Sequence, residues 1–142
     1  MLPLLMLAMI ASNNSDTAPC PGTTTIEINA CLAERFQEAD ANLNRYYGVA
    51  LRRIRAENGT SVAQMLIQAG RSWLSYRDSE CGAVLEKHRD GTIRTSMEIA
   101  CRIRLTRLRT YLIWRNWLTH PDSTPPLLPR PATDGALSDG RG

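Results

Sequence analysis

The chain has 142 residues, of which 43% are hydrophobic and 6% aromatic, enough apolar material for one core and too little for two. Its 17 Lys and Arg against 14 Asp and Glu give a net charge of +3, which is small for a dedicated nucleic-acid-binding protein. Neither His88 nor His120 has the partners of a zinc hydrolase or of a His-assisted nucleophile nearby in sequence. The sequence therefore predicts one domain that is not an enzyme and uses no cofactor or metal ion.

The apolar run at the N-terminus predicts export. Leu2 to Ala11 are all apolar or proline, and the polar run Ser12 to Thr17 follows them. This length matches the core of a signal peptide and falls short of the roughly 20 residues that span a membrane. We interpret residues 1–18 as signal peptide and leader, with no transmembrane span and a periplasmic or secreted product. A buried N-terminal segment is the alternative interpretation.

The four cysteines predict two disulfide bonds. Cys20, Cys31, Cys81 and Cys101 lie at intervals of 11, 50 and 20 residues. Zinc ligands usually come in pairs about two to four residues apart, whereas disulfides persist in oxidising compartments. Three pairings are possible, and we favour Cys20 with Cys31 and Cys81 with Cys101 because both close local loops.

Three sequence patterns of the capping-box type predict where three long helices begin. In each, a Ser or Thr stands three residues before a Glu or Gln: Thr24 and Glu27, Ser61 and Gln64, Thr95 and Glu98. Apolar residues then recur every three or four positions over about 25–55, from 62 to a stop at Asp90–Gly91, and over about 96–117. We expect an all-α domain over residues 19–119, an up-down-up bundle of three helices joined by two disulfides.

Each predicted helix has an apolar face for the core. The first face is Ile28, Leu32, Phe36, Ala39, Leu43, Tyr47, Ala50 and Ile54. The second is Val62, Leu66, Ala69, Trp73 and Tyr76, in a helix where Gly70 and Gly82 predict a kink or a close helix crossing. The third is Met97, Cys101, Leu105, Leu108 and Leu112, widened by Ile99, Ile103 and Ile113.

The C-terminal residues predict a tail without a fold of its own. Residues 120–142 hold five of the eight prolines and have no helical period. This composition is typical of a flexible, disordered, extended segment.

Several short strings resemble a known family. Helix one holds Cys31, Ala39-Asp40, Leu43-Asn44 and Tyr47; helix two holds Trp73, Tyr76-Arg77-Asp78 and Glu80-Cys81; helix three holds Cys101, Thr106, Arg109 and Leu112. Over about Cys20 to Leu118 this resembles the LprI-like lysozyme-inhibitor N-terminal domain family of small exported bacterial helical domains. The resemblance implies export, disulfides, a helical fold and, from the family's name, lysozyme inhibition.

We interpret the polar residues of this pattern as structural. Trp73 and Tyr76 are expected on the apolar face, so Arg77 at its edge can reach Asp40 or Asn44 of the first helix. Tyr47, Asp78 and Glu80 belong to the same motif. Its Trp, Tyr and Arg side chains would also suit a recognition patch, which is the alternative.

Two surfaces are candidates for a partner. The first is the acidic set at the start of helix one, Glu27, Glu34 and Glu38, which would suit a basic lysozyme. The second is the aromatic and basic cluster Trp114, Arg115 and Trp117.

Two function classes follow from these features. The first is an exported envelope-binding module that acts on a lysozyme or another envelope protein by binding. The alternative is a cytosolic helical adaptor whose arginine-rich third helix contacts nucleic acid, although the low net charge makes a nucleic-acid partner the weaker expectation.

Overall fold

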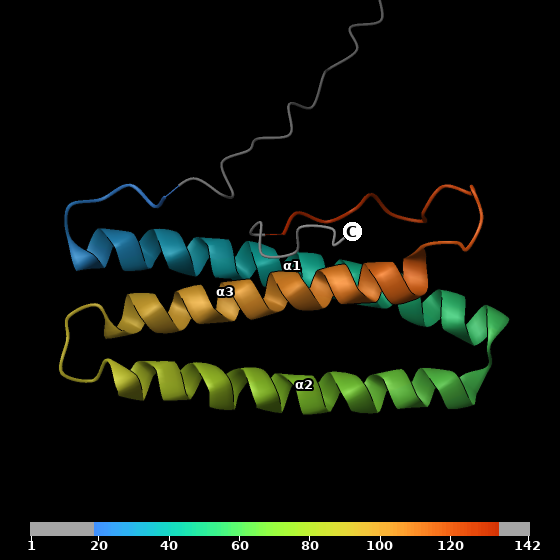
Figure 1. The fold of residues 1–142 in the computed structure, drawn as a ribbon, viewed down its shortest axis with the longest axis horizontal. Coiled ribbons are helices and arrows are strands. Elements are labelled where there is room, and N and C mark those ends of the chain that lie inside the picture. The colour runs from blue at the N-terminus through green and yellow to red at the C-terminus, as the bar shows by residue number, and fades with distance from the viewer. Residues whose placement is uncertain (1–18, 134–142) are drawn as a thin grey trace, which may run out of the picture.

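The computed structural model describes residues 19–133, which form three long helices arranged up, down and up (Figure 1). They are α1 (Thr25–Glu57), α2 (Thr60–Lys87) and α3 (Arg94–Ile113), and a π-helical turn, η2 (Trp114–Leu118), continues α3. Helix α3 packs against both other helices, whereas α1 and α2 make fewer contacts with each other. The predicted all-α bundle is confirmed, with no strand within 19–133. The predicted signal peptide lies outside the described residues.

The start of α1 is the capping box that the sequence predicts. The Glu27 amide donates to Thr24 Oγ1 at 3.2 Å, and the Thr24 amide donates to the Glu27 carboxylate at 3.0 Å. These hydrogen bonds, those from the Thr24 and Thr23 amides foremost, hold the pKa of Glu27 below its usual value. Glu27 therefore keeps its negative charge at this helix end, where the helix dipole favours it.

The other two predicted capping boxes are wrong. Helix α2 begins at Thr60, directly after Gly59, and α3 begins at Arg94, after Ile93; neither start has a side-chain cap. Gly59 has a φ of 87°, a backbone conformation that favours glycine. The two-residue turn Asn58–Gly59 thus starts α2 before Ser61 is reached.

Both predicted disulfides are confirmed. Cys20 of the leading loop joins Cys31 of α1, with a Cα–Cα distance of 5.9 Å. Cys81 of α2 joins Cys101 of α3 at 5.6 Å. The second bond joins the two helices near their connecting turn. In the chain-entropy picture, each disulfide contributes about 3 kcal/mol to stability by restricting the unfolded chain.

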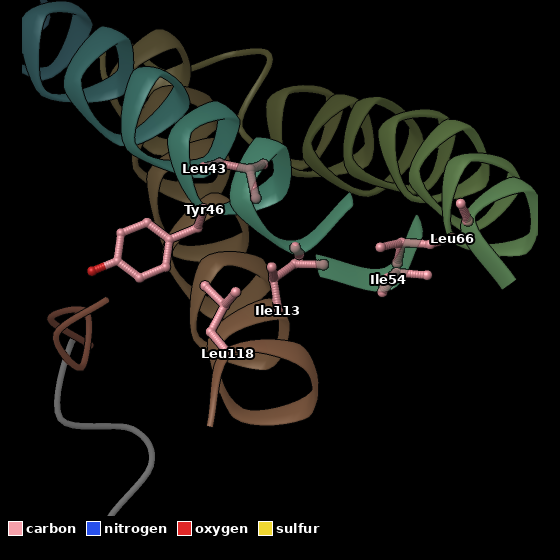
Figure 2. Packing of buried hydrophobic residues seen from close by; sticks show 8 residues of the cluster. Leu43, Tyr46, Ile54, Leu66, Ile113 and Leu118 are labelled. Carbon is pink, nitrogen blue, oxygen red and sulfur yellow. The ribbon is translucent and has the colours of Figure 1, made fainter. Parts of the chain in front are cut away.

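The main apolar cluster lies where α1 ends, α2 begins and α3 passes into η2. Leu43, Ile54, Leu66, Ile113 and Leu118 meet there (Figure 2). Of the predicted core positions, Ala69, Tyr76, Met97 and Leu112 are exposed instead. Helix α2 turns Ala63, Leu66, Arg77 and Cys81 inward, and α3 turns Ile103, Thr106, Thr110 and Tyr111 inward. The inward faces of α2 and α3 therefore agree only in part with the predicted apolar faces, at Leu66, Cys101, Ile103 and Ile113.

The segment after η2 packs on the bundle, contrary to the predicted disordered tail. It runs back beside the helices (Figure 1), and the Leu127 amide donates to the Leu118 carbonyl at 2.9 Å. Tyr46 Oη donates to the Pro129 carbonyl at 2.6 Å, and Trp114 Nε1 donates to that of Leu128 at 2.9 Å. Hydrogen bonds from helix side chains replace the regular backbone bonds that this proline-rich segment cannot make. Residues 134–142 lie outside the described part.

Removing the Tyr46 hydroxyl tests whether the C-terminal segment packs on the bundle in solution. Burial raises the pKa of Tyr46 above its usual value, in keeping with a phenol that donates to a carbonyl. We expect Tyr46→Phe to lower the free energy of unfolding by about 1 kcal/mol. In a chain shortened after Thr119 the same substitution should cost less than about 0.5 kcal/mol, because its acceptor is gone.

Denaturant unfolding followed by circular dichroism measures both losses. Tyr76→Phe is the control, since Tyr76 is 53% exposed, and it should leave stability unchanged. Equal losses from Tyr46→Phe in the long and the shortened chain would contradict the packed segment.

Candidate functional site

Arg77 of α2 links all three helices through its side chain. Its Nη1 donates to Asp40 Oδ1 of α1 and to Thr106 Oγ1 of α3, both at 3.0 Å. Arg77 is 8% exposed and Thr106 is fully buried, whereas the Asp40 side chain is 40% exposed. Because both bonds use one charged donor group, they fix the register of α2 against α1 and α3 together.

Two aromatic rings enclose the Arg77 guanidinium. Its central carbon lies 5.1 Å from the ring centre of Phe36 and 5.0 Å from that of Trp73. A flat, weakly hydrated guanidinium stacks on aromatic faces with a smaller loss of hydration than an ammonium group. The rings therefore offset part of the cost of burying this charge.

The remaining polar residues of the motif take different places. Asp78 accepts a 2.7 Å hydrogen bond from Arg102 of α3, and Tyr47 is half-buried beside Gly70. Asn44, Tyr76 and Glu80 are exposed. Of the two expected partners of Arg77, Asp40 receives the hydrogen bond. The expectation that Tyr76 lies on the apolar face is wrong, because the inward face of α2 passes through Arg77.

Sequence reasoning did not assign a role to two residues of α3 that complete this site, Thr106 and Arg109. Thr106 accepts from Arg77, and the Arg109 guanidinium lies 6.0 Å from the Trp73 ring centre. Arg109 also lines a pocket of about 370 Å³ between α1 and α2. The sequence signal for Thr106 and Arg109 is that each is a polar residue among the apolar residues of the third helix.

The two tryptophans of the second candidate surface contact other parts of the same chain. Trp114 and Trp117 pack partly buried against the core, and Trp114 also contacts the C-terminal segment. The Arg130 guanidinium lies 6.0 Å from the Trp114 ring centre. Arg115 alone of that cluster is exposed.

The acidic set of α1 does lie on the surface. Glu27, Glu34 and Glu38 are all exposed, at helical positions seven and four residues apart on one face. The carboxylate of Glu27 is engaged in the capping box. Glu34 and Glu38 lie outside that capping box.

The arginines of α3 do not form one outward face. Arg102 pairs with Asp78 at 2.7 Å and with Glu98 at 3.1 Å, Arg109 lines the pocket, and Arg104 is exposed. Their charges point to different neighbours. This arrangement does not favour the nucleic-acid alternative.

Among residues 19–133 no group of three or more His, Cys, Asp or Glu side chains is placed to hold a metal ion. A separate search of the same residues finds no helix long and apolar enough to cross a membrane.

A family model described as "Lysozyme inhibitor LprI" matches residues 17–112. The chain belongs to this lysozyme inhibitor family. The match covers all four cysteines and the whole Arg77 site, so the LprI resemblance seen in the sequence is confirmed.

Two curated relatives are similar to this LprI-family chain. The uncharacterized protein R02472 of Rhizobium meliloti (strain 1021) is 26% identical over 120 residues, which cover 77% of this chain and 86% of the relative. The uncharacterized protein YecT of Escherichia coli (strain K12) is 35% identical over 65 residues, 41% of this chain and 40% of its own length. No solved structure matches the chain.

The link between Arg77 and Asp40 can be measured by a double-mutant cycle. We expect Arg77→Ala and Asp40→Ala to show a coupling free energy of about 1 kcal/mol or more, because they share a charged hydrogen bond. Arg77→Ala alone should cost more than Asp40→Ala alone, since it also removes the Thr106 bond and the ring contacts. Equilibrium unfolding of the oxidised chain gives all three values.

The matched control is Asn44→Ala, one helical turn from Asp40 and exposed. Its losses should add to those of Arg77→Ala within about 0.5 kcal/mol. Additive losses for Arg77 and Asp40 as well would show that the bond does not contribute to stability.

Proposed function

We propose that this protein acts outside the cytoplasm by binding, and that its partner is a lysozyme. The observation that carries the proposal is the family match over residues 17–112, which includes both disulfides. Disulfide bonds persist in oxidising compartments, which supports a periplasmic or secreted location. The apolar run Leu2 to Ala11 supports export independently.

Charge limits which surface can meet such a partner. Between Cys20 and Thr119 the chain carries 15 basic and 10 acidic residues, a net charge of +5. Animal-type lysozymes are basic, so long-range repulsion would slow their encounter with this domain. An acidic local surface would have to offset that repulsion.

Glu34 and Glu38 of α1 are the proposed contact for this partner. Both are exposed, and they stand one turn apart on one helix face. Of the α3 arginines, Arg102 is paired with Asp78 and Arg109 lines the pocket. Carboxylates projecting from this helix would meet the basic rim of a lysozyme cleft.

A muramidase assay on cell walls with the oxidised domain tests the proposal. We expect inhibition at domain concentrations on the order of 10 µM or lower. The double variant Glu34→Lys, Glu38→Lys should weaken inhibition by about tenfold at low salt, and by less at physiological salt because salt screens the charges.

The matched control is Glu80→Lys, Asp90→Lys, which changes the net charge equally at two exposed positions outside α1. It should leave inhibition largely intact. No inhibition by the unmodified domain at either salt concentration would overturn the lysozyme proposal. Inhibition that both double variants reduce equally would keep the partner and reject the Glu34 and Glu38 surface.

A further inference from the structure

The pocket between α1 and α2 is lined by two arginines that each keep one hydrogen-bond donor unsatisfied. Arg77 Nε and Arg109 Nη2 are both buried, and neither has a hydrogen-bond partner among residues 19–133. The Arg77 side chain is only 9% exposed, and both arginines line the pocket. Buried N–H groups of arginine left without an acceptor are costly, so their presence in native folds calls for an explanation.

The charge of the pocket favours a negative ligand. Arg71, Arg77 and Arg109 line it together with a single carboxylate, that of Asp40. Asp40 already accepts a hydrogen bond from Arg77 Nη1. Burial lowers the pKa of Arg109 from its usual value, because the charged guanidinium loses water there. An anion beside Arg109 would stabilise that charge.

The walls of the pocket are apolar on the remaining sides. Leu43, Ile67 and Leu74 line it, and the Trp73 ring lies beside both guanidinium groups. A volume of about 370 Å³ is at the small end of ligand pockets. Two free donors and apolar walls suit one singly charged acceptor group attached to an apolar group better than a free phosphate or a polyanion.

Gly70 keeps this pocket open on the α2 side. A methyl group placed on Gly70 would lie 3.3 Å from the Tyr47 hydroxyl, which is a tight contact. At Gly82, by contrast, an added methyl group would have no neighbour within 4 Å.

We propose that this pocket is a binding site for a small carboxylate that carries an apolar group. The carboxylate would accept from Arg109 Nη2 and Arg77 Nε, and the apolar group would lie against Leu43, Ile67 and Leu74. The site does not depend on lysozyme binding, since it lies apart from Glu34 and Glu38. The ligand can be a free acid or the C-terminal residue of a peptide, because both present the same chemistry.

Nuclear magnetic resonance titration of the oxidised chain with N-acetyl-leucine tests the site. We expect saturable shifts of the Trp73 indole N–H and of the Gly70 amide, with a Kd on the order of 1 mM for so small a probe. N-acetyl-leucinamide, which lacks the charge, should bind at least about tenfold more weakly, and so should inorganic phosphate. A short peptide ending in leucine distinguishes the sources: tighter binding than N-acetyl-leucine indicates a chain terminus, and equal or weaker binding a free acid.

Variants assign the binding to the proposed groups. Arg109→Gln should weaken N-acetyl-leucine about tenfold, whereas Arg104→Gln, exposed on the same helix, should leave its affinity unchanged. Should Arg109→Gln disturb the fold, Arg71→Gln at the exposed rim and Gly70→Ala provide independent weakening variants. The proposal is overturned if N-acetyl-leucine causes no saturable shift, if the amide or phosphate binds as well as the acid, or if folded variants in the pocket keep full affinity.

Discussion

The arrangement of the three helices depends on one buried charge, the guanidinium of Arg77. It is held between the rings of Phe36 and Trp73 and hydrogen-bonded to Asp40 and Thr106, so α1, α2 and α3 all contribute to its surroundings. A buried guanidinium is stable only where it finds hydrogen-bond partners, because burying it without them costs more free energy than any one apolar contact contributes. This constraint specifies the register of α2, whose buried apolar residues are few: Ala63, Leu66 and Cys81. The disulfide between Cys81 and Cys101 lies one turn beyond Arg77 on α2, and the apolar cluster around Ile54 and Ile113 lies on the other side.

The same interaction explains why a pocket remains between α1 and α2. These two helices contact each other less than either contacts α3, and Arg77 with Trp73 bridges the space between them. Gly70 prevents α2 from filling that space with a side chain. The pocket and the acidic face of α1 are therefore separate features, and a ligand in one need not compete with a protein on the other.

Local sequence signals predicted the helices and the disulfides well, but long-range contacts only in part. The capping box at Thr24 is formed by four consecutive residues. The one predicted at Ser61 does not form, because the turn at Gly59 starts α2 one residue earlier, at Thr60. Arg77 could be paired with Asp40 because both flank apolar stripes. The role of Thr106 could not be predicted, because it depends on which face of α3 is buried. That face includes Thr110 and Tyr111, which the apolar pattern did not indicate. Residues 120–133 have no helical period, so nothing in their pattern predicts that Tyr46 and Trp114 hold them.

The Arg77 guanidinium is enclosed by two rings and joined by hydrogen bonds to two neighbouring helices. Nuclear magnetic resonance of the oxidised chain, with the arginine side-chain N–H groups labelled, tests it directly. We expect resolved, slowly exchanging Arg77 resonances with nuclear Overhauser contacts to both Phe36 and Trp73 ring protons and to the Thr106 side chain. A rapidly exchanging Arg77 guanidinium without ring contacts would contradict it.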